Sequence, residues 1–206
     1  MARIGLMGGT FDPIHNGHLL LARQAHAEYK LHQIWFMPAG QPPHKHDHSI
    51  TPAADRCAMI RLAIAPFPFF RFFDFEIRRE GDSYTAETLR LLHRTYPQHE
   101  FYFIVGADSF LEIESWYHPD EILRQTRLLV ADREYPGAAR SIKEQARYLT
   151  ERYDAKIQLL HCSEMHVASG ELRAMIARQE PISSYVPRAV ETYICANGLY
   201  TAQKSL

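Results

Sequence analysis

Cysteine is scarce in this sequence, and its spacing excludes a disulfide framework. The 206 residues contain three cysteines, Cys57, Cys162 and Cys195, and no C-x-x-C pair. An odd and widely spaced set is typical of a reducing compartment, so we expect buried thiols. Long apolar runs are also absent: Gly8-Gly9 interrupts the first one, which argues against a secretory leader, and no window could span a membrane. We therefore expect a cytoplasmic protein without a membrane partner.

Neither sign of charge is in excess. The chain has 23 Lys and Arg against 24 Asp and Glu, a formal net charge of -1. A general nucleic-acid binder usually needs a basic excess, so we expect no nucleic-acid partner, whereas a local patch for one triphosphate stays compatible. Hydrophobic residues make up 46% and charged residues 23%, and no repeat or linker divides the chain. We expect one domain over residues 1–206.

Three widespread motifs are missing. The sequence contains no G-x-G-x-x-G, no G-x-x-x-x-G-K-[ST] and no G-x-S-x-G. The first belongs to dinucleotide-binding dehydrogenases, the second to P-loop kinases and the third to serine hydrolases. Each of these functions therefore loses its main support.

Short apolar runs alternate with amphipathic segments along the whole chain. Strands are predicted at residues 3–7, 34–37, 69–75, 101–105, 128–131 and 157–160. Helices are predicted from about Gly17, from Thr51 as N-cap with Pro52 in the first turn, at 89–96 and 142–153, from Leu172, and from Pro187 to just before Gly198. This alternation implies an α/β fold, a parallel sheet with helices on both faces.

In sheets of this kind the ligand lies beyond the carboxyl ends of the strands. That rule favours the turns after Met7, Met37, Val105, Ala131 and Leu160. The first of these turns carries the strongest signal in the chain.

After the first predicted strand the sequence reads Gly8-Gly9-Thr10-Phe11-Asp12-Pro13-Ile14-His15-Asn16-Gly17-His18. We interpret the two glycines as a turn that lets backbone N–H groups approach an anion. The following helix adds its N-terminal N–H groups and the positive end of its dipole. His15 precedes that helix and His18 lies in its first turn, so both imidazoles can face the same anion. The segment predicts a phosphate-binding site.

This segment resembles the signature of the nucleotidylyltransferase superfamily, a strand followed by a His-x-Gly-His-type motif. The full string is similar to that of the bacterial nicotinate-nucleotide adenylyltransferases, and four later segments extend the resemblance over nearly the whole chain. The resemblance implies a Rossmann-like, doubly wound fold with a small helical cap at about residues 167–206. It also implies that His15 and His18 contact the ATP phosphates and stabilise the departing pyrophosphate, and that substrate is bound by Gly8, Gly9, Thr10 and Phe11.

The second segment is a proline loop, Gln41-Pro42-Pro43-His44-Lys45. A lysine on a stiff loop suits a phosphate contact, and the family has a similar loop near its substrates. Lys45 is therefore a catalytic candidate and His44 a substrate-binding candidate. His44, His46 and His48 alternate in a way that can bind metal weakly, but no Cys or carboxylate set completes a tetrahedral site, so we expect no structural metal.

The third segment, Ser83-Tyr84-Thr85, begins a predicted helix and offers hydroxyls for capping it. The family has a similar Ser-Tyr-Thr, in which the threonine helps to hold nicotinate mononucleotide. Thr85 is therefore expected to have a part in both helix capping and substrate binding.

The fourth segment is Gly106-Ala107-Asp108-Ser109 with the later Trp116-Tyr117. Gly106 permits close approach of a ligand, Asp108 can accept hydrogen bonds from sugar hydroxyls, and Trp116 can stack on a pyridinium ring. Trp116 could equally be a core residue. In the family this pattern touches both substrates, with the tryptophan near the nicotinate ring, so Tyr117 is included among the expected binding residues.

The fifth segment, residues 167–173, is similar to a family helix start that binds the ATP phosphates. Ser169 and Arg173 are retained, whereas Ala168 and Gly170 replace a serine and a threonine. Backbone N–H groups at a helix start need no side chain, so we expect the phosphate contact to survive. Arg133, just beyond a predicted strand, matches an arginine that the family often has near the mononucleotide.

The resemblance implies an adenylyltransferase of NAD biosynthesis that joins nicotinate mononucleotide and ATP into nicotinate adenine dinucleotide and pyrophosphate. The 5′-phosphate attacks the α-phosphorus of ATP directly and in line, and Mg²⁺ enters with ATP without a dedicated protein cage. Three alternatives stay open: a sister enzyme acting on nicotinamide mononucleotide or phosphopantetheine, a non-catalytic nucleotide sensor, and a His-rich metal-binding protein. The sequence leaves assembly into a homo-oligomer open.

Overall fold

A parallel six-stranded sheet forms the centre of the protein. The computed structural model describes residues 1–42, 50–132, 138–161 and 167–201. Within these ranges the strands are β1 (Ala2–Gly9), β2 (Gln33–Pro38), β3 (Phe70–Phe72), β4 (His99–Val105), β5 (Arg127–Ala131) and β6 (Lys156–Leu160). Their order is β3-β2-β1-β4-β5-β6, with every neighbouring pair parallel. The predicted parallel sheet is confirmed, and the order reverses between β1 and β4.

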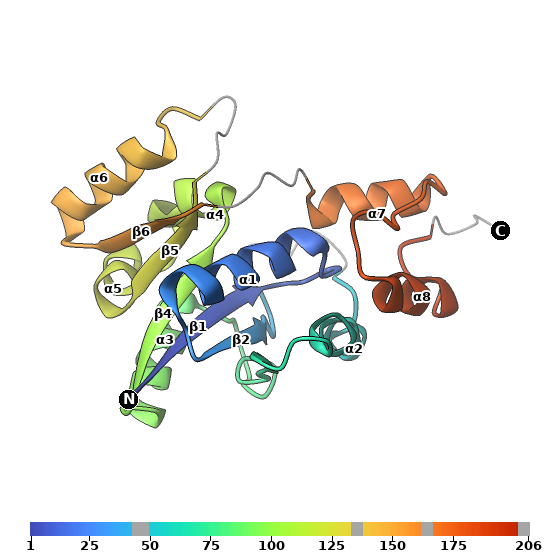
Figure 1. Cartoon of the computed structure of the whole chain (residues 1–206), viewed down its shortest axis with the longest axis horizontal. Coiled ribbons are helices and arrows are strands. Elements are labelled where there is room, and N and C mark those ends of the chain that lie inside the picture. The colour runs from blue at the N-terminus through green and yellow to red at the C-terminus, as the bar shows by residue number, and fades with distance from the viewer. Residues whose placement is uncertain (43–49, 133–137, 162–166, 202–206) are drawn as a thin grey trace.

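Helices cover both faces of this sheet, as predicted for a doubly wound fold (Figure 1). One hydrophobic core packs α1 (Asn16–Tyr29), α2 (Ala53–Ile64), α7 (Ser169–Ala177) and α8 (Arg188–Ala196) on the sheet. The other core packs α3 (Thr85–Thr95), α4 (Ala107–Leu111), α5 (Pro119–Gln125) and α6 (Ile142–Tyr153), together with the 3-10 helix η1 (Ile113–Ser115). Among the described residues no helix is long and apolar enough to cross a membrane.

The C-terminal helices join the first of these cores. Leu172 of α7 and Val190 and Ile194 of α8 are buried in the same cluster as Met7 of β1. Figure 1 shows α8 beside α2 at one end of the molecule, with α6 at the other. The Tyr193 hydroxyl of α8 donates to Asp55 Oδ1 of α2 at 2.8 Å. The C-terminal helices thus pack on the sheet through apolar side chains, and a hydrogen bond joins α8 to α2.

The predicted Gly-Gly turn is wrong, because β1 continues through both glycines to Gly9. Neither glycine has a positive φ, so conformational freedom is not the reason for their presence. A Cβ on Gly8 would stand 3.2 Å from Phe103 Cε2 of the neighbouring strand, and one on Gly9 would meet the Phe11 ring at 3.5 Å. Gly8 therefore makes room for the Phe103 ring, whereas a Cβ on Gly9 would be in ordinary contact with Phe11, and the loop begins after them at Thr10.

Several predicted boundaries are also corrected. The strand expected over residues 69–75 is limited to β3; the Phe73 N–H still donates to the Phe36 carbonyl at 2.9 Å, and its ring packs on Trp35 with centroids 4.5 Å apart. Pro52 rather than Thr51 is the N-cap of α2, and Pro187 caps α8 instead of lying in its first turn. The helices between residues 107 and 125 were not predicted. Of the described thiols, Cys57 is buried as expected, but Cys195 is exposed.

Close packing at Gly5 of β1 gives a stability prediction. A Cβ there would stand 2.6 Å from Ile34 Cδ1 and 2.9 Å from Leu31 Cδ1. Because overpacking a tight core is destabilising, we expect Gly5→Ala to lower the free energy of unfolding by about 1–3 kcal/mol in urea titrations. The Ile34→Val background removes the nearest methyl group, so Gly5→Ala should cost less there. An equal cost in both backgrounds would contradict the packing argument.

Candidate active site

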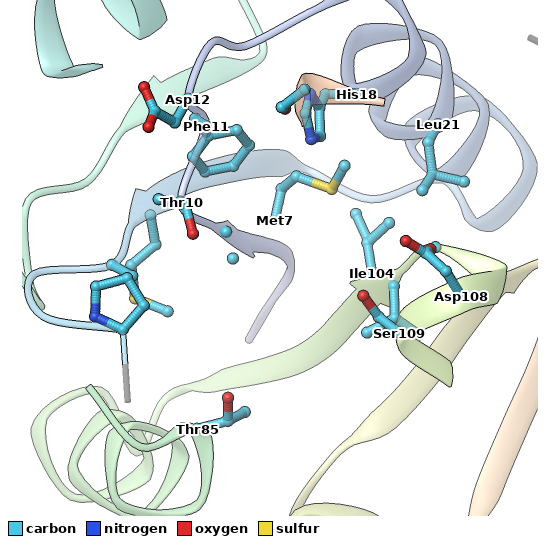
Figure 2. A pocket seen from close by; sticks show the side chains of 18 of the residues that line it. Met7, Thr10, Phe11, Asp12, His18, Leu21, Thr85, Ile104, Asp108 and Ser109 are labelled. Atoms are coloured by element: carbon cyan, nitrogen blue, oxygen red, sulfur yellow. The ribbon is translucent and has the colours of Figure 1, made fainter. Parts of the chain in front are cut away.

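A cavity of about 1030 Å³ opens at the carboxyl ends of β1 and β4, where the strand order reverses. This is the place where doubly wound sheets bind ligands, and the volume suits a nucleotide. Figure 2 shows Phe11 and His18 on one side of the hollow, Asp108 and Ser109 of α4 on another, and Thr85 of α3 beneath. The predicted binding residues that line it are Gly8, Gly9, Thr10, Phe11, His15, His18, Thr85, Gly106, Asp108, Trp116, Tyr117, Ser169 and Arg173.

His15 and His18 lie together at the start of α1. His15 is the N-cap residue, and its backbone N–H donates to His18 Nδ1 at 3.2 Å. The two imidazoles stack with centroids 3.7 Å apart and planes 30° from parallel. Since Nδ1 of His18 is an acceptor, the proton of its neutral ring belongs on Nε2, which is then a hydrogen-bond donor. The two rings thus lie side by side, and that both face the same anion stays a prediction.

The surroundings of these rings favour an anion. The first turn of α1 contains no acidic residue, so the positive end of the helix dipole is not neutralised there. His15 is buried, and a Cβ on Gly17 would stand 3.0 Å from its Nδ1 and 3.1 Å from Val167 Cγ1. A larger residue at position 17 would therefore crowd the His15 imidazole. Phe11 meets the other ring edge-on, with its centroid 5.0 Å from that of His18.

Arg56 of α2 supports the loop between β1 and α1. Its side chain is 2% exposed, and it donates to the carbonyl oxygens of Thr10 at 2.8 Å, Ala39 at 3.0 Å and Thr51 at 3.0 Å. Burial lowers the pKa of this guanidinium, and the charge of Asp12 opposes that shift. Sequence reasoning missed Arg56. The available signal was a cation at helical spacing from Ile60 and Ile64, which lie on the buried face of α2.

Asp12 connects the same loop to the C-terminal part of the chain. It is 4% exposed, and its Oδ1 accepts from the Tyr200 hydroxyl at 2.7 Å while its Oδ2 accepts from the Thr51 N–H at 3.3 Å. Arg173 Nη1 donates to the Asp12 carbonyl oxygen at 2.7 Å, and Ser169 Oγ donates to that of Pro13 at 2.9 Å. Ser169 and Arg173, predicted as phosphate ligands, thus line the cavity and contact the loop; their contact with phosphate stays a prediction.

The start of α3 forms another wall of the cavity. Tyr84 is its N-cap and Thr85 its first residue, and no side chain caps the helix, so the predicted capping by Ser83 or Thr85 is wrong. Ser83 Oγ instead accepts from the Gly40 N–H at 3.0 Å. Beneath this start, the buried Glu76 carboxyl accepts from Thr88 Oγ1 at 2.7 Å, and burial raises its pKa. Sequence reasoning missed Glu76, because its contact with Thr88 depends on the fold.

The fourth predicted segment lines the opposite wall. A Cβ on Gly106 would stand 2.6 Å from Asp108 Oδ1, so the glycine leaves space for this carboxylate at the start of α4. Trp116 is half-buried and meets Phe103 edge-on, with centroids 6.3 Å apart, so it belongs to both the core margin and the cavity wall. Tyr117 is 45% exposed and packs on the Tyr84 ring at a centroid distance of 4.4 Å.

Some predicted residues lie outside the described part of the chain. These are His44, Lys45, His46, His48 and Arg133. Within the ranges that the structure describes, no group of three or more His, Cys, Asp or Glu side chains is arranged to hold a metal ion.

Comparison with known proteins agrees with this geometry. The cytidylyltransferase-like family profile matches residues 6–186. A protein of Lachnoclostridium phytofermentans named "Probable nicotinate-nucleotide adenylyltransferase" is 39% identical over 97% of this chain and 100% of its own length. A protein of the same name from Moorella thermoacetica is 41% identical over 96% of this chain and 91% of its own length.

Solved structures share the fold. The Plasmodium falciparum nicotinic acid mononucleotide adenylyltransferase complexed with APC superposes with a TM-score of 0.79 at 20% identity, covering 97% of this chain and 98% of that one. The same enzyme complexed with NaAD gives a TM-score of 0.78. A Vibrio parahaemolyticus structure gives 0.69 at 16% identity, over 97% and 96% of the two chains. From its full-length relatives and its matching profile, the chain belongs to the cytidylyltransferase-like family, among the nicotinate-nucleotide adenylyltransferases.

Proposed function

We propose that this protein transfers the adenylyl group of ATP to nicotinate mononucleotide, giving nicotinate adenine dinucleotide and pyrophosphate in NAD biosynthesis. The observation that carries the proposal is the cavity at the β1/β4 reversal, with stacked His15 and His18 at the start of α1 in its wall. The names of its full-length relatives specify the substrates. Buried Cys57 is a free thiol, which suits the reducing cytoplasm where we place this reaction.

The reaction needs no general base on the protein. A phosphate monoester has a second pKa of about 6, so the mononucleotide phosphate is already an anion at neutral pH. One of its oxygens forms a bond to the α-phosphorus of ATP, and the bond from that phosphorus to the bridging oxygen of pyrophosphate breaks. Catalysis must therefore hold two anions in line and stabilise charge on the leaving group.

The cavity wall around α1 supplies groups for the ATP phosphates. His18 Nε2 is a donor that suits a leaving pyrophosphate, and the positive end of the α1 dipole lies beside it. Arg173 adds a permanent positive charge next to the same loop, since its guanidinium contacts Asp12. We assign His15, His18 and Arg173 to transition-state stabilisation, and Lys45 joins them as a prediction from the sequence.

The opposite walls supply groups for the mononucleotide. Trp116 presents a half-buried indole to the cavity, which suits stacking on the pyridinium ring. Thr85 at the start of α3 and Asp108 at the start of α4 offer a hydroxyl and a carboxylate for the ribose phosphate and sugar hydroxyls. Both substrates can then meet within one cavity, because these walls face the histidine wall.

We treat Mg²⁺ as part of the ATP substrate. The described residues offer no ligand cluster of their own for a metal, and an ion carried by phosphates and water needs none. Magnesium would neutralise charge on the phosphates, while the residues of this chain orient them.

The competing functions make different demands on the cavity. Phosphopantetheine has no aromatic ring to stack on the Trp116 indole, so this side chain does not favour a sister enzyme for that substrate. Nicotinamide mononucleotide has the same pyridinium ring as nicotinate mononucleotide and fits the same stacking site. A nucleotide sensor would bind ATP without releasing pyrophosphate. The names of the relatives favour the nicotinate substrate.

Pyrophosphate release distinguishes these functions. With ATP and Mg²⁺, we expect rapid release with nicotinate mononucleotide, a lower kcat/KM with nicotinamide mononucleotide and none with phosphopantetheine. The measurement is an enzyme-coupled pyrophosphate assay with each acceptor at several concentrations. ATP binding in calorimetry without release from any acceptor would support the sensor instead.

The role of His18 gives a second prediction. Losing a donor aimed at developing charge typically costs about 10²–10³ in kcat, so we expect His18→Ala to lower kcat at least 100-fold and to change the KM for the mononucleotide far less. His26→Ala is the matched control, because His26 lies on the same helix but stacks on Phe69 at 3.8 Å instead of lining the cavity. Unchanged turnover in the His18 variant would refute the assignment.

The packing of Gly17 gives a third prediction. The methyl group of Gly17→Ala would press on the His15 ring at 3.0 Å and displace it from His18. Because small misplacements of catalytic groups are costly, we expect kcat to fall about tenfold or more. The melting temperature should change little, since alanine favours a helix and offsets the crowding. Wild-type turnover in this variant would show that the position of His15 is unimportant.

A further inference from the structure

The C-terminal part of the chain contacts the loop of residues 10–15 and the first residue of α1 at several points. The backbone N–H of Asn16 donates to the Tyr185 carbonyl at 2.7 Å, and its side chain donates to that of Ser184 at 3.2 Å. Ser169 and Arg173 donate to loop carbonyls, as described above. Tyr200 completes the set with its bond to Asp12 Oδ1. These contacts join residues that are 156 to 188 positions apart in the sequence. They hold the loop and the start of α1, where the two histidines lie.

The Tyr200 contact differs from the other contacts because its acceptor is a buried carboxylate, whereas the others have backbone carbonyl oxygens as acceptors. Asp12 is 4% exposed, so its carboxylate depends on protein donors, and within the described ranges these include the Tyr200 hydroxyl and the Thr51 N–H. Losing a donor from a buried carboxylate is costly, since water cannot readily replace it. Burial raises the pKa of Tyr200, so the phenol keeps its proton and remains a donor.

The backbone at both ends of this contact is unusual. Phe11, the neighbour of Asp12, has φ of 53°, and Tyr200 has φ of 62°. Non-glycine residues in this left-handed region carry strain and persist where surrounding contacts enforce it. Asp12 lies only three residues before His15, the N-cap of α1, so the strained segment and the histidines belong to one short stretch of chain.

We propose that Tyr200 is a positioning residue of the active site: its hydroxyl fixes Asp12, and through Asp12 it fixes the loop that places His15 and His18. This inference rests on the proposed adenylyl transfer only for its kinetic consequence. It makes the segment after α8 part of the catalytic apparatus, although Tyr200 does not line the cavity. Neither the periodicity nor the motifs of the sequence indicate this role for Tyr200.

Tyr200→Phe tests the proposal while it keeps the aromatic packing. We expect kcat for pyrophosphate release to fall about tenfold or more, with the KM values for ATP and the mononucleotide changed less than twofold. Tyr193→Phe is the matched control. It removes a phenol bond of nearly equal length, 2.8 Å to Asp55, between the same C-terminal region and α2, without touching the loop. We expect wild-type kcat from this control.

A spectroscopic measurement separates positioning from general stability. The imidazole proton resonances of His15 and His18, assigned with the His15→Ala and His18→Ala variants, should shift in Tyr200→Phe and stay at wild-type values in Tyr193→Phe. In an Asp12→Ala background, Tyr200→Phe should change kcat less than twofold further, because the acceptor is already gone. This second comparison stays informative even if the single variants differ in melting temperature.

The outcomes are distinct. Absence of pyrophosphate release from wild type with every acceptor would overturn the proposed function, and the histidine resonances would still decide the role of Tyr200. Wild-type kcat and unshifted resonances in Tyr200→Phe would overturn the positioning role. Equal kinetic losses in Tyr200→Phe and Tyr193→Phe would also overturn it, since the effect would then be one of stability.

Discussion

The position of the two active-site imidazoles depends on buried hydrogen bonds to residues 10–15, which lie in neither a helix nor a strand. Arg56 alone serves three carbonyl oxygens, including that of Thr10, and Asp12 accepts bonds from Tyr200 and Arg173. Apolar contacts are not directional, whereas a hydrogen bond requires a set distance and angle, so a buried polar group loses its partner when it moves. These bonds therefore select one loop conformation and compensate the strain at Phe11.

The sheet topology explains how one cavity can present separate walls to the two substrates that we propose. The loop after β1 and the start of α7 accompany the helices of one face, whereas α3, α4 and η1 belong to the other. Because the strand order reverses between β1 and β4, the cavity lies between these two sets of helices. Donors for phosphate and an indole for a flat ring are thereby contributed by opposite faces, with the carboxyl edge of the sheet between them.

Local patterns predicted the elements that are long or strongly apolar, such as β4, α1 and α6, because periodicity and turn residues act over a few positions. The glycines after Met7 were assigned to a turn, since only the neighbouring strand reveals that Phe103 needs the space. The short helices α4 and α5 were not predicted, because segments of five and seven residues contain too few apolar repeats to show helical periodicity. Arg56, Glu76 and Tyr200 are important through distant partners, which no local pattern encodes.

The start of α7 lacks the two hydroxyls that the family resemblance of residues 167–173 implies. Ala168 is the N-cap and offers no side-chain acceptor, and Gly170 leaves the space beside Arg173 open, with Nη2 3.8 Å from an added Cβ. The Ser169 hydroxyl is engaged with Pro13, so it stabilises the loop. In the function that we propose, a phosphate at this helix is held by backbone N–H groups and by the Arg173 guanidinium, which has five N–H donors and uses one on the Asp12 carbonyl. In this arrangement Ser169 supports the loop, whereas Arg173, one helix turn later, both contacts the loop and is available to a phosphate.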